Sequence, residues 1–130
     1  MTWNELGAST FALLTTYKKD GTPVGTPVWV APDGDRIVVW TNPATWKVKR
    51  IRRNSDVTLR SSDARGRPKG EVVFAGTATV LDADGTQRVR DLISRKYGII
   101  GTSLIKLHKL FRGADASIGL AVTRRLDPGE

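Results

Sequence analysis

The sequence predicts a mainly β fold with some α-helix: an antiparallel β-barrel, closed or partly closed, with short helices over its ends. Six short segments alternate apolar and polar residues, as half-buried strands do, and tight-turn signals separate the first three of them. Longer helical patterns occur only after the third strand. Many short strands in one chain favour a barrel, because closure removes exposed sheet edges. The length of 130 residues predicts a single domain, residues 1–130, with one modest core.

The N-terminal part contains three strands joined by hairpins. Residues 3–6 suit one turn of helix ahead of the first strand. Asp20 and Gly21 signal a hairpin turn, and residues 32–35 signal a second one. Pro27 lacks the N–H that a strand ladder needs, so we expect an open edge or a bulge at that point. The three strands delimited in this way span residues 9–18, 24–31 and 36–41.

The C-terminal part combines strands with a pair of helices. Gly76 interrupts a long strand and predicts a bend or bulge there. Asp82 suits the cap of a helix that runs to about Tyr97, and Gly98 suits its end. A second helical pattern follows over residues 102–113. The three remaining strands span residues 55–61, 71–81 and 116–123.

A short helix directly after the third strand has an unusual set of charges. Asn42 suits the N-cap of this helix, and Pro43 suits its first position. Cations near a helix N-terminus oppose the helix dipole, by about 0.3–1 kcal/mol each, whereas an anion is stabilised there. The charged residues of the first two turns are all cations: Lys47, Lys49 and Arg50.

A bound anion would reverse the sign of this interaction. The backbone N–H groups at the helix start, the hydroxyls of Thr41 and Thr45, and the Lys47 ammonium would then converge on it. The pattern therefore predicts a phosphate site at a strand-to-helix junction. The alternative is a solvated basic helix without a ligand, and these residues alone favour neither interpretation.

The composition narrows the classes of function. A net charge of +8 and a pI of about 10.3 indicate an acidic partner: nucleic acid, an anionic membrane surface or a polyanionic small molecule. The chain has no cysteine and one histidine, which excludes a disulfide framework, a thiolate nucleophile and a multi-histidine metal site. No apolar run approaches the roughly 20 residues of a membrane-spanning helix, and no signal-peptide pattern is present. We therefore expect a soluble cytoplasmic protein.

The strand-to-helix junction resembles a known family. Its run WTNPATWK, residues 40–47, is similar to the phosphate-binding segment of the pyridoxamine 5′-phosphate oxidase-like split barrels. The strand order also matches that family over the whole length. Within the family, TPVWV (residues 26–30) and KVKRIRRNSDVTL (residues 47–59) resemble the small actinobacterial enzymes that use the deazaflavin coenzyme F420. The residues that match the phosphate-binding motif are Trp40, Thr41, Asn42, Thr45 and Lys47.

The resemblance implies an FMN-binding split β-barrel that forms a homodimer, with two cofactor sites in the groove between the subunits. Thr41, Thr45 and Lys47 would hold the cofactor phosphate, and main-chain groups of residues 26–29 would line its ring system. Further cations would meet its anionic tail in loose contacts, among them Arg53, Arg65, Arg67 and Lys69. The full set of predicted cofactor-binding residues is Thr26, Pro27, Val28, Trp29, Thr41, Asn42, Thr45, Trp46, Lys47, Lys49 and Arg50.

The implied activity is that of an F420-dependent oxidoreductase, which transfers a hydride between F420H2 and an electron-poor small organic substrate. One departure matters: the flavin-dependent oxidases of the family usually have an Arg before the Lys, where this chain has Trp46. Their pyridoxal phosphate-binding residues also have no evident counterpart. These differences argue against pyridoxamine phosphate oxidation and make FMN the second choice of cofactor.

Three alternatives to this function stay open. They are an FMN-binding oxidoreductase of the same fold, a non-enzymatic protein that binds a flavin or a tetrapyrrole, and a nucleic-acid-binding barrel, for which basic charge with interleaved aromatic residues is typical. We expect neither a nucleic acid nor a membrane as partner. No catalytic side chain and no metal ligand are assigned, because hydride transfer to or from a deazaflavin asks mainly for binding and orientation.

Overall fold

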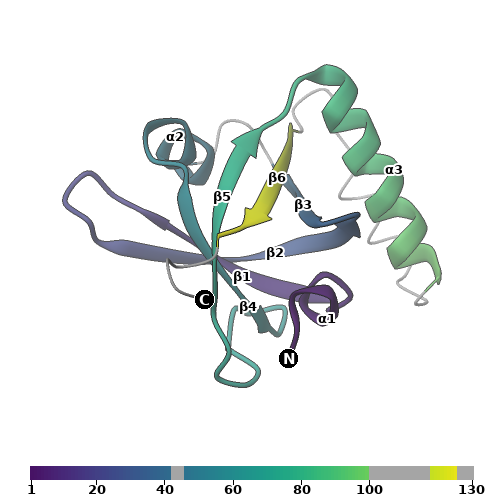
Figure 1. The fold of residues 1–130 in the computed structure, drawn as a ribbon, viewed down its shortest axis with the longest axis horizontal. Helices are drawn as coiled ribbons and strands as arrows, with labels where there is room; N and C mark the ends of the chain where they lie inside the picture. Colours follow the sequence, from purple (N-terminus) through teal and green to yellow (C-terminus); the bar gives the residue numbers. More distant parts are fainter. Residues whose placement is uncertain (42–45, 100–117, 126–130) are drawn as a thin grey trace.

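Six antiparallel strands close into a barrel, and helices pack against it from different sides (Figure 1). The computed structural model describes residues 1–41, 46–99 and 118–125. The ring order is β1-β2-β3-β6-β5-β4, and β4 closes it by pairing with β1. The predicted fold class, a mainly β antiparallel barrel with short helices, is confirmed. The elements are α1 (Trp3–Gly7), β1 (Phe11–Tyr17), β2 (Pro23–Asp33), β3 (Arg36–Thr41), α2 (Trp46–Arg53), β4 (Asp56–Ser62), β5 (Phe74–Val80), α3 (Ala83–Ile99) and β6 (Ile118–Arg124).

Apolar side chains fill the barrel interior because burial alternates along the strands. In β1, every second residue is buried, and the residues between them are half-buried on the outer face. Val57 and Leu59 of β4 point inward, as alternation along that strand requires, and Leu14, Val30 and Leu120 are fully buried beside them. Burial of apolar area stabilises the fold by about 25 cal/mol per Å², so this interior is the main source of barrel stability.

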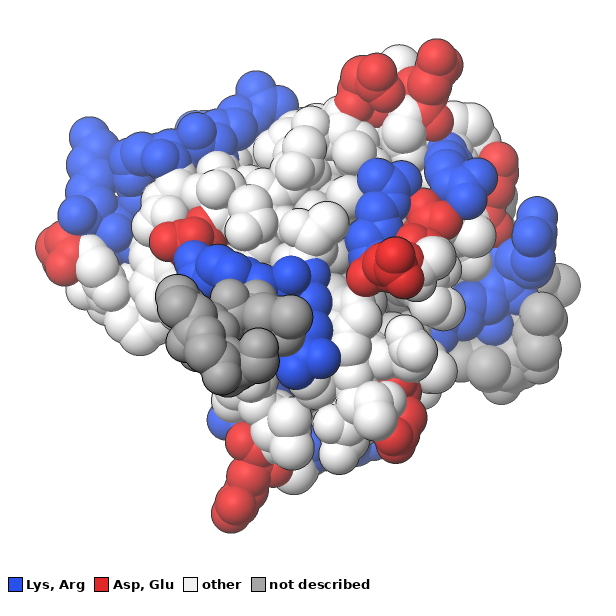
Figure 2. All heavy atoms as spheres, viewed as in Figure 1, with Lys and Arg blue, Asp and Glu red and all other residues white. Residues whose placement is uncertain are grey.

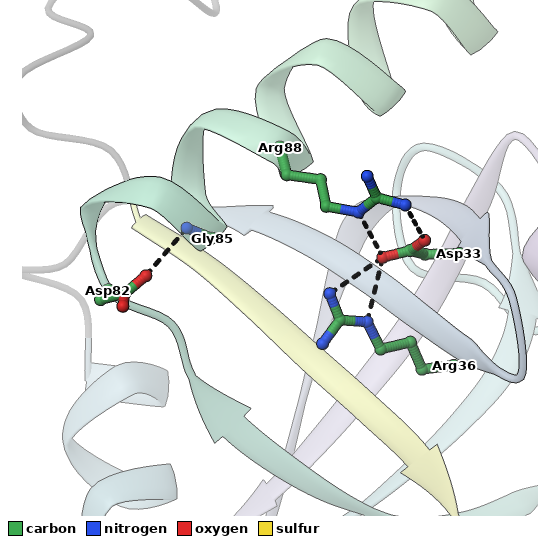
Figure 3. A network of polar contacts seen from close by, with 5 residues as sticks. All are labelled: Asp33, Arg36, Asp82, Gly85 and Arg88. Atoms are coloured by element: carbon green, nitrogen blue, oxygen red, sulfur yellow. Dashed lines mark hydrogen bonds and ion pairs between the residues drawn. The ribbon is translucent and has the colours of Figure 1, made fainter.

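Helix α3 covers the outer face of β2, β3 and β6 (Figure 1). Its apolar side forms a second core, in which Val89 and Ile93 pack with Val38 and Trp40 of β3. The predicted cap is confirmed, because the Asp82 carboxylate accepts a hydrogen bond from the Gly85 N–H at 2.9 Å (Figure 3). The predicted end at about Tyr97 is two residues early, since the helix continues through Gly98 to Ile99.

An ion-pair network ties α3 to the turn between β2 and β3 (Figure 3). The Asp33 carboxylate accepts from Nε of Arg36 at 3.0 Å and from Nη2 of Arg88 at 2.7 Å. The hydrogen bond from Arg88 is the main cause that lowers the pKa of Asp33 to about 2, and Arg36 acts in the same direction. The network therefore fixes the first half of α3 against the sheet.

Two expectations for the C-terminal half are wrong, and a third lies outside the described residues. The strand expected over residues 71–81 covers only Phe74–Val80. Gly76 lies in unbroken register opposite Val57 and Arg124, so the predicted bend or bulge is wrong. A Cβ at Gly76 would lie 2.6 Å from Cγ1 of Val122, so glycine is needed there for close approach rather than for a kink. The helix expected over residues 102–113 lies outside the described residues.

The helix predicted to start at Asn42 and Pro43 is described only from Trp46 onward, and those two residues lie outside the described ranges. Within the described ranges, no helix has the length and apolar character needed to cross a membrane.

Candidate functional site

Helix α2 and the β1–β2 hairpin stand next to each other at one side of the barrel. The helix packs against β1 and β5, and it is anchored by Val48 and Ile51, which are buried as their helical spacing predicts. The hairpin extends beyond the end of β3, because β3 pairs with β2 only from Trp29 onward and the earlier residues of β2 have no partner in β3. The polar face of α2 and the hairpin turn are thereby left to form a shared surface.

This surface contains an open groove of about 470 Å³, which we call the basic groove. Cations come to it from both elements, and no carboxylate is among the residues that line it. Figure 2 shows basic side chains gathered in a band at the upper left, where Figure 1 places α2 and the hairpin. The lining residues are Lys18, Lys19, Trp46, Lys49, Arg50 and Arg53.

Two contacts organise the wall that α2 contributes. The Lys49 ammonium lies 4.6 Å from the centre of the Trp46 ring, a cation–π distance, and Trp46 itself is 69% exposed. The Arg53 guanidinium donates from Nη2 to the Tyr17 carbonyl oxygen at 2.8 Å, which joins α2 to the end of β1. The groove therefore offers one flat aromatic face and several ammonium and guanidinium groups to a ligand.

The phosphate-site residues are described only in part. Lys47 is partly buried on α2, and Thr41 is partly buried at the end of β3. Burial lowers the pKa of Lys47, and the nearby positive charge of Arg50 lowers it further. Both effects act against the charged form, and an anion beside this ammonium would offset them by favouring that form. Asn42 and Thr45, the other predicted residues of this segment, lie outside the described residues.

The segment predicted to line the cofactor ring lies in β2 and does not line the basic groove. Among the described strands, the edge of Thr26, Pro27 and Val28 opposite β1 has no partner, which confirms the open edge expected at Pro27. Val28 is buried in the barrel core, so only its main chain faces outward. Trp29 stacks on Tyr97 of α3, with ring centres 4.4 Å apart at 21°, instead of presenting that face to a ligand.

The cations of the loop after β4 lie apart from the basic groove. Arg67 pairs with Asp63 at 2.7 Å, and Asp63 also accepts from the Arg65 N–H at 2.9 Å. Gly66 passes close to Pro27, since a Cβ there would lie 3.3 Å from the proline ring. The loop thus approaches Pro27, and Arg65, Arg67 and Lys69 are not among the residues that line the basic groove.

Sequence reasoning missed two members of the groove as binding residues. Lys18 and Lys19 precede the hairpin turn, about thirty positions before α2, and only the hairpin's reach brings them to the groove. Two consecutive lysines directly before the Asp-Gly turn are the one available signal, because they put positive charge at a protruding tip.

The chain matches the family model "Pyridoxamine 5′-phosphate oxidase" over residues 4–115. No curated protein matches the sequence. Among solved structures, a conserved hypothetical protein from Mycobacterium tuberculosis is 19% identical, with a TM-score of 0.71 over 97% of this chain and 82% of its own.

Two further solved structures show how varied the proteins of this fold are. The heme storage protein HutZ from Vibrio cholerae is 12% identical, with a TM-score of 0.68 over 95% of this chain and 87% of its own. An F420 reductase is 18% identical, with a TM-score of 0.62 over 97% of this chain and 95% of its own. At such identities the likeness shows a common fold and nothing finer.

Proposed function

Because the chain belongs to the pyridoxamine 5′-phosphate oxidase family, a flavin-binding split-barrel family, we propose that it is an oxidoreductase that uses coenzyme F420. Its reaction is hydride transfer between F420H2 and an electron-poor small organic molecule. The observation that carries the choice of cofactor is the basic groove, where five cations and one exposed indole face a space of about 470 Å³. An F420 reductase among the structures of the same fold is consistent with this choice.

The charges of the chain fit the charges of the cofactor. F420 has a phosphodiester and a polyglutamate tail, whereas FMN has a single phosphate, so F420 offers more negative charge to the groove. Lys47, partly buried and without a paired carboxylate among the described residues, is suited to the phosphate. Lys49, Arg50 and Arg53 are suited to the tail, with Lys18 and Lys19 opposite them. Each exposed pair contributes about 0–1 kcal/mol, but together they attract the ligand.

The roles of the protein in this reaction are binding and orientation. The bound coenzyme supplies the hydride chemistry, at C5 of its deazaflavin ring. Main-chain groups along the open edge of Thr26, Pro27 and Val28 would meet the ring, and Thr41 would add a hydroxyl to the phosphate site. Orientation of this kind is itself a large part of catalysis, so a site without a titratable catalytic side chain is sufficient.

The proposal includes a homodimer with the cofactor site between its subunits. Leu13, Pro27 and Trp29 lie on the outer face of β1 and β2 and are only partly buried in one chain. A second copy would cover apolar area that a chain of this size leaves half-exposed. Light scattering at micromolar concentration should give a dimer, and a monomer would contradict this part of the proposal.

Titration of the apo protein tests the choice of ligand. We expect F420 to bind once per subunit, more tightly than FMN, and the phosphate-free deazaflavin FO to bind more weakly than F420. The F420 affinity should fall with added salt, because exposed charges are screened beyond ~8–10 Å near physiological ionic strength. Equal affinities for F420 and FO, or an affinity that salt leaves unchanged, would refute the charge-based assignment.

Two controls separate the alternatives. A single-stranded oligonucleotide that displaces F420 from the protein would favour a nucleic-acid-binding barrel. Incubation of the F420H2-loaded protein with quinones, enones, nitro compounds and tetrapyrroles tests for turnover, seen as recovery of the absorbance of oxidised F420. Tight binding without any turnover would favour a carrier over an enzyme.

A further inference from the structure

The last turns of α3 bring a lysine onto the main chain of three other segments. The Lys96 ammonium donates to the carbonyl oxygens of Gly7 at 2.9 Å, Ser9 at 2.5 Å and Val30 at 2.5 Å. Gly7 ends α1, Ser9 belongs to the link before β1, and Val30 lies in β2. An ammonium has three N–H donors, and here three carbonyl oxygens are available to accept them.

No carboxylate pairs with Lys96 among the described residues; its ammonium contacts neutral main chain and lies 5.0 Å from the centre of the Tyr97 ring. Burial lowers the pKa of Lys96 to about 8, and the three carbonyl oxygens favour the charged form. A ring of backbone carbonyl oxygens around one positive charge is the chemistry by which proteins bind monovalent cations. The three carbonyls thus form a cation site whose occupant is tethered to the chain.

Tyr97, the next residue, completes the junction from the same helical turn. Its hydroxyl donates to the Thr10 carbonyl oxygen and accepts from the Val30 N–H at 3.1 Å. The hydroxyl therefore bridges β2 and the start of β1, where their ladder ends at the pair Phe11 and Trp29. The Tyr97 ring stacks on Trp29, so the position of Trp29 depends on where α3 holds this turn.

We propose that the carbonyls of Gly7, Ser9 and Val30 form a monovalent-cation site that Lys96 fills, and that its occupancy holds Trp29 and the adjoining part of β2 in place. Lys96 is then a positioning residue for the segment of residues 26–29. The link to the cofactor ring rests on the function proposed above, whereas the cation site itself does not. Without the ammonium, the carbonyl oxygens of Gly7 and Ser9 would lose the Lys96 donor, and that of Val30 would keep only the Tyr97 hydroxyl, at 3.2 Å, as a side-chain donor.

Chemical rescue of the apo protein tests this proposal. Lys96→Ala removes three methylenes and the ammonium, a fragment that propylammonium matches in size and charge. We expect this variant to melt about 5–15 °C below the wild type. Propylammonium should restore much of that loss, and tetramethylammonium, which has no N–H donor, should not do so at equal ionic strength. Equal effects of the two salts would refute the cation site.

Lys96→Met is the matched control, because it keeps a side chain of similar length without charge. We expect it to melt below the wild type and to be insensitive to propylammonium, since its own side chain blocks the space. A Met variant as stable as the wild type would show that only the stem of Lys96 matters and would overturn the proposal. This variant also decides the question if Lys96→Ala fails to fold.

Cofactor binding gives the second measurement. In Lys96→Ala, F420 affinity should fall several-fold and return with propylammonium, together with the near-ultraviolet circular dichroism of the stacked Trp29 and Tyr97. If rescue of stability occurs while the wild type binds no F420, the cation site stands and the proposed function fails. If the wild type binds F420 but the amine rescues neither stability nor affinity, the cation site fails alone.

Discussion

Replacing Lys47 with alanine distinguishes a phosphate site from a solvated basic helix. Lys47 is partly buried, and both its burial and the charge of Arg50 disfavour its ammonium form. If the ammonium donates to a cofactor phosphate, Lys47→Ala removes one charge-assisted hydrogen bond, worth roughly 1.5–3 kcal/mol. The dissociation constant for F420 should therefore rise about 10- to 150-fold, as measured by titration.

The apo protein should respond to Lys47→Ala in the opposite direction or hardly at all. A lysine with a lowered pKa binds its proton less well in the folded state than in the unfolded state, so its charge opposes folding at neutral pH. Its removal should leave the apo melting temperature unchanged or slightly higher. A lower apo melting temperature with unchanged F420 affinity would show a structural lysine and refute the phosphate site.

Arg52→Ala is the matched control for the net charge. Arg52 lies on the same helix, is exposed, and does not line the basic groove. Both variants lose one positive charge, so any long-range attraction of the cofactor weakens equally in both. A loss of affinity in Arg52→Ala as large as in Lys47→Ala would mean that the helix contributes only general charge.

Two further predictions test the fold. Asp33→Asn should lower the free energy of unfolding by about 1–2 kcal/mol at neutral pH, because Arg36 and Arg88 are partly exposed and their pairs are screened. The folded-state pKa of Asp33 is about 2, below its ordinary value, so this stabilisation is present above pH 3.8 and is lost as the pH falls toward 2. In urea unfolding, the free energies of unfolding of the wild type and the variant should therefore become equal near pH 2. A difference that stays constant with pH would contradict the assignment. Gly76→Ala should lower the melting temperature by roughly 5–15 °C, because its Cβ would lie 2.6 Å from Val122 and 2.9 Å from the Thr123 carbonyl oxygen. An unchanged melting temperature would mean that β6 can shift to accommodate the methyl group without loss of stability.

The barrel could be predicted because its signals are local. Period-two alternation predicts the strands and the inward residues of β4, and the Asp-Gly turn predicts the first hairpin, whereas the buried residues of β1 are Ala12, Leu14 and Thr16 and not the alternate set that begins at Phe11. Closure of the ring pairs β3 with β6 and β4 with β1. These pairings join strands far apart in the sequence, so the pattern of no single segment predicts them. Gly76 shows the limit of local reasoning. A glycine in a strand signals a bulge or a close approach equally well, and only the neighbouring strand decides between them.

The candidate site was predictable where charges follow one another along the chain. The run of cations on α2 is visible in the sequence, and three of them line the basic groove together with Trp46: Lys49, Arg50 and Arg53. The contacts of Trp29 and Lys96 were not predictable, since they join residues more than sixty positions apart. The periodicity of β2 predicts only that the Trp29 side chain faces away from the barrel interior. It cannot predict that Tyr97 of α3 stacks on this side chain.

The distribution of carboxylates is the strongest physical argument that the basic groove has an anionic ligand. In the described part of the chain, Asp33, Asp56 and Asp63 each pair with arginines, and all of these arginines lie outside the groove. These carboxylates thus neutralise arginines in ion pairs elsewhere on the barrel and not in the basic groove. The cations of α2 and the hairpin share one concave surface without such pairing, although their mutual repulsion opposes the compact state. Interspersed charges would give the same solubility without that repulsion.

An external polyanion reverses the balance, since every cation that repels its neighbours in the apo protein attracts the ligand. This predicts that F420 stabilises the protein most at low ionic strength, where both the repulsion and its relief are largest.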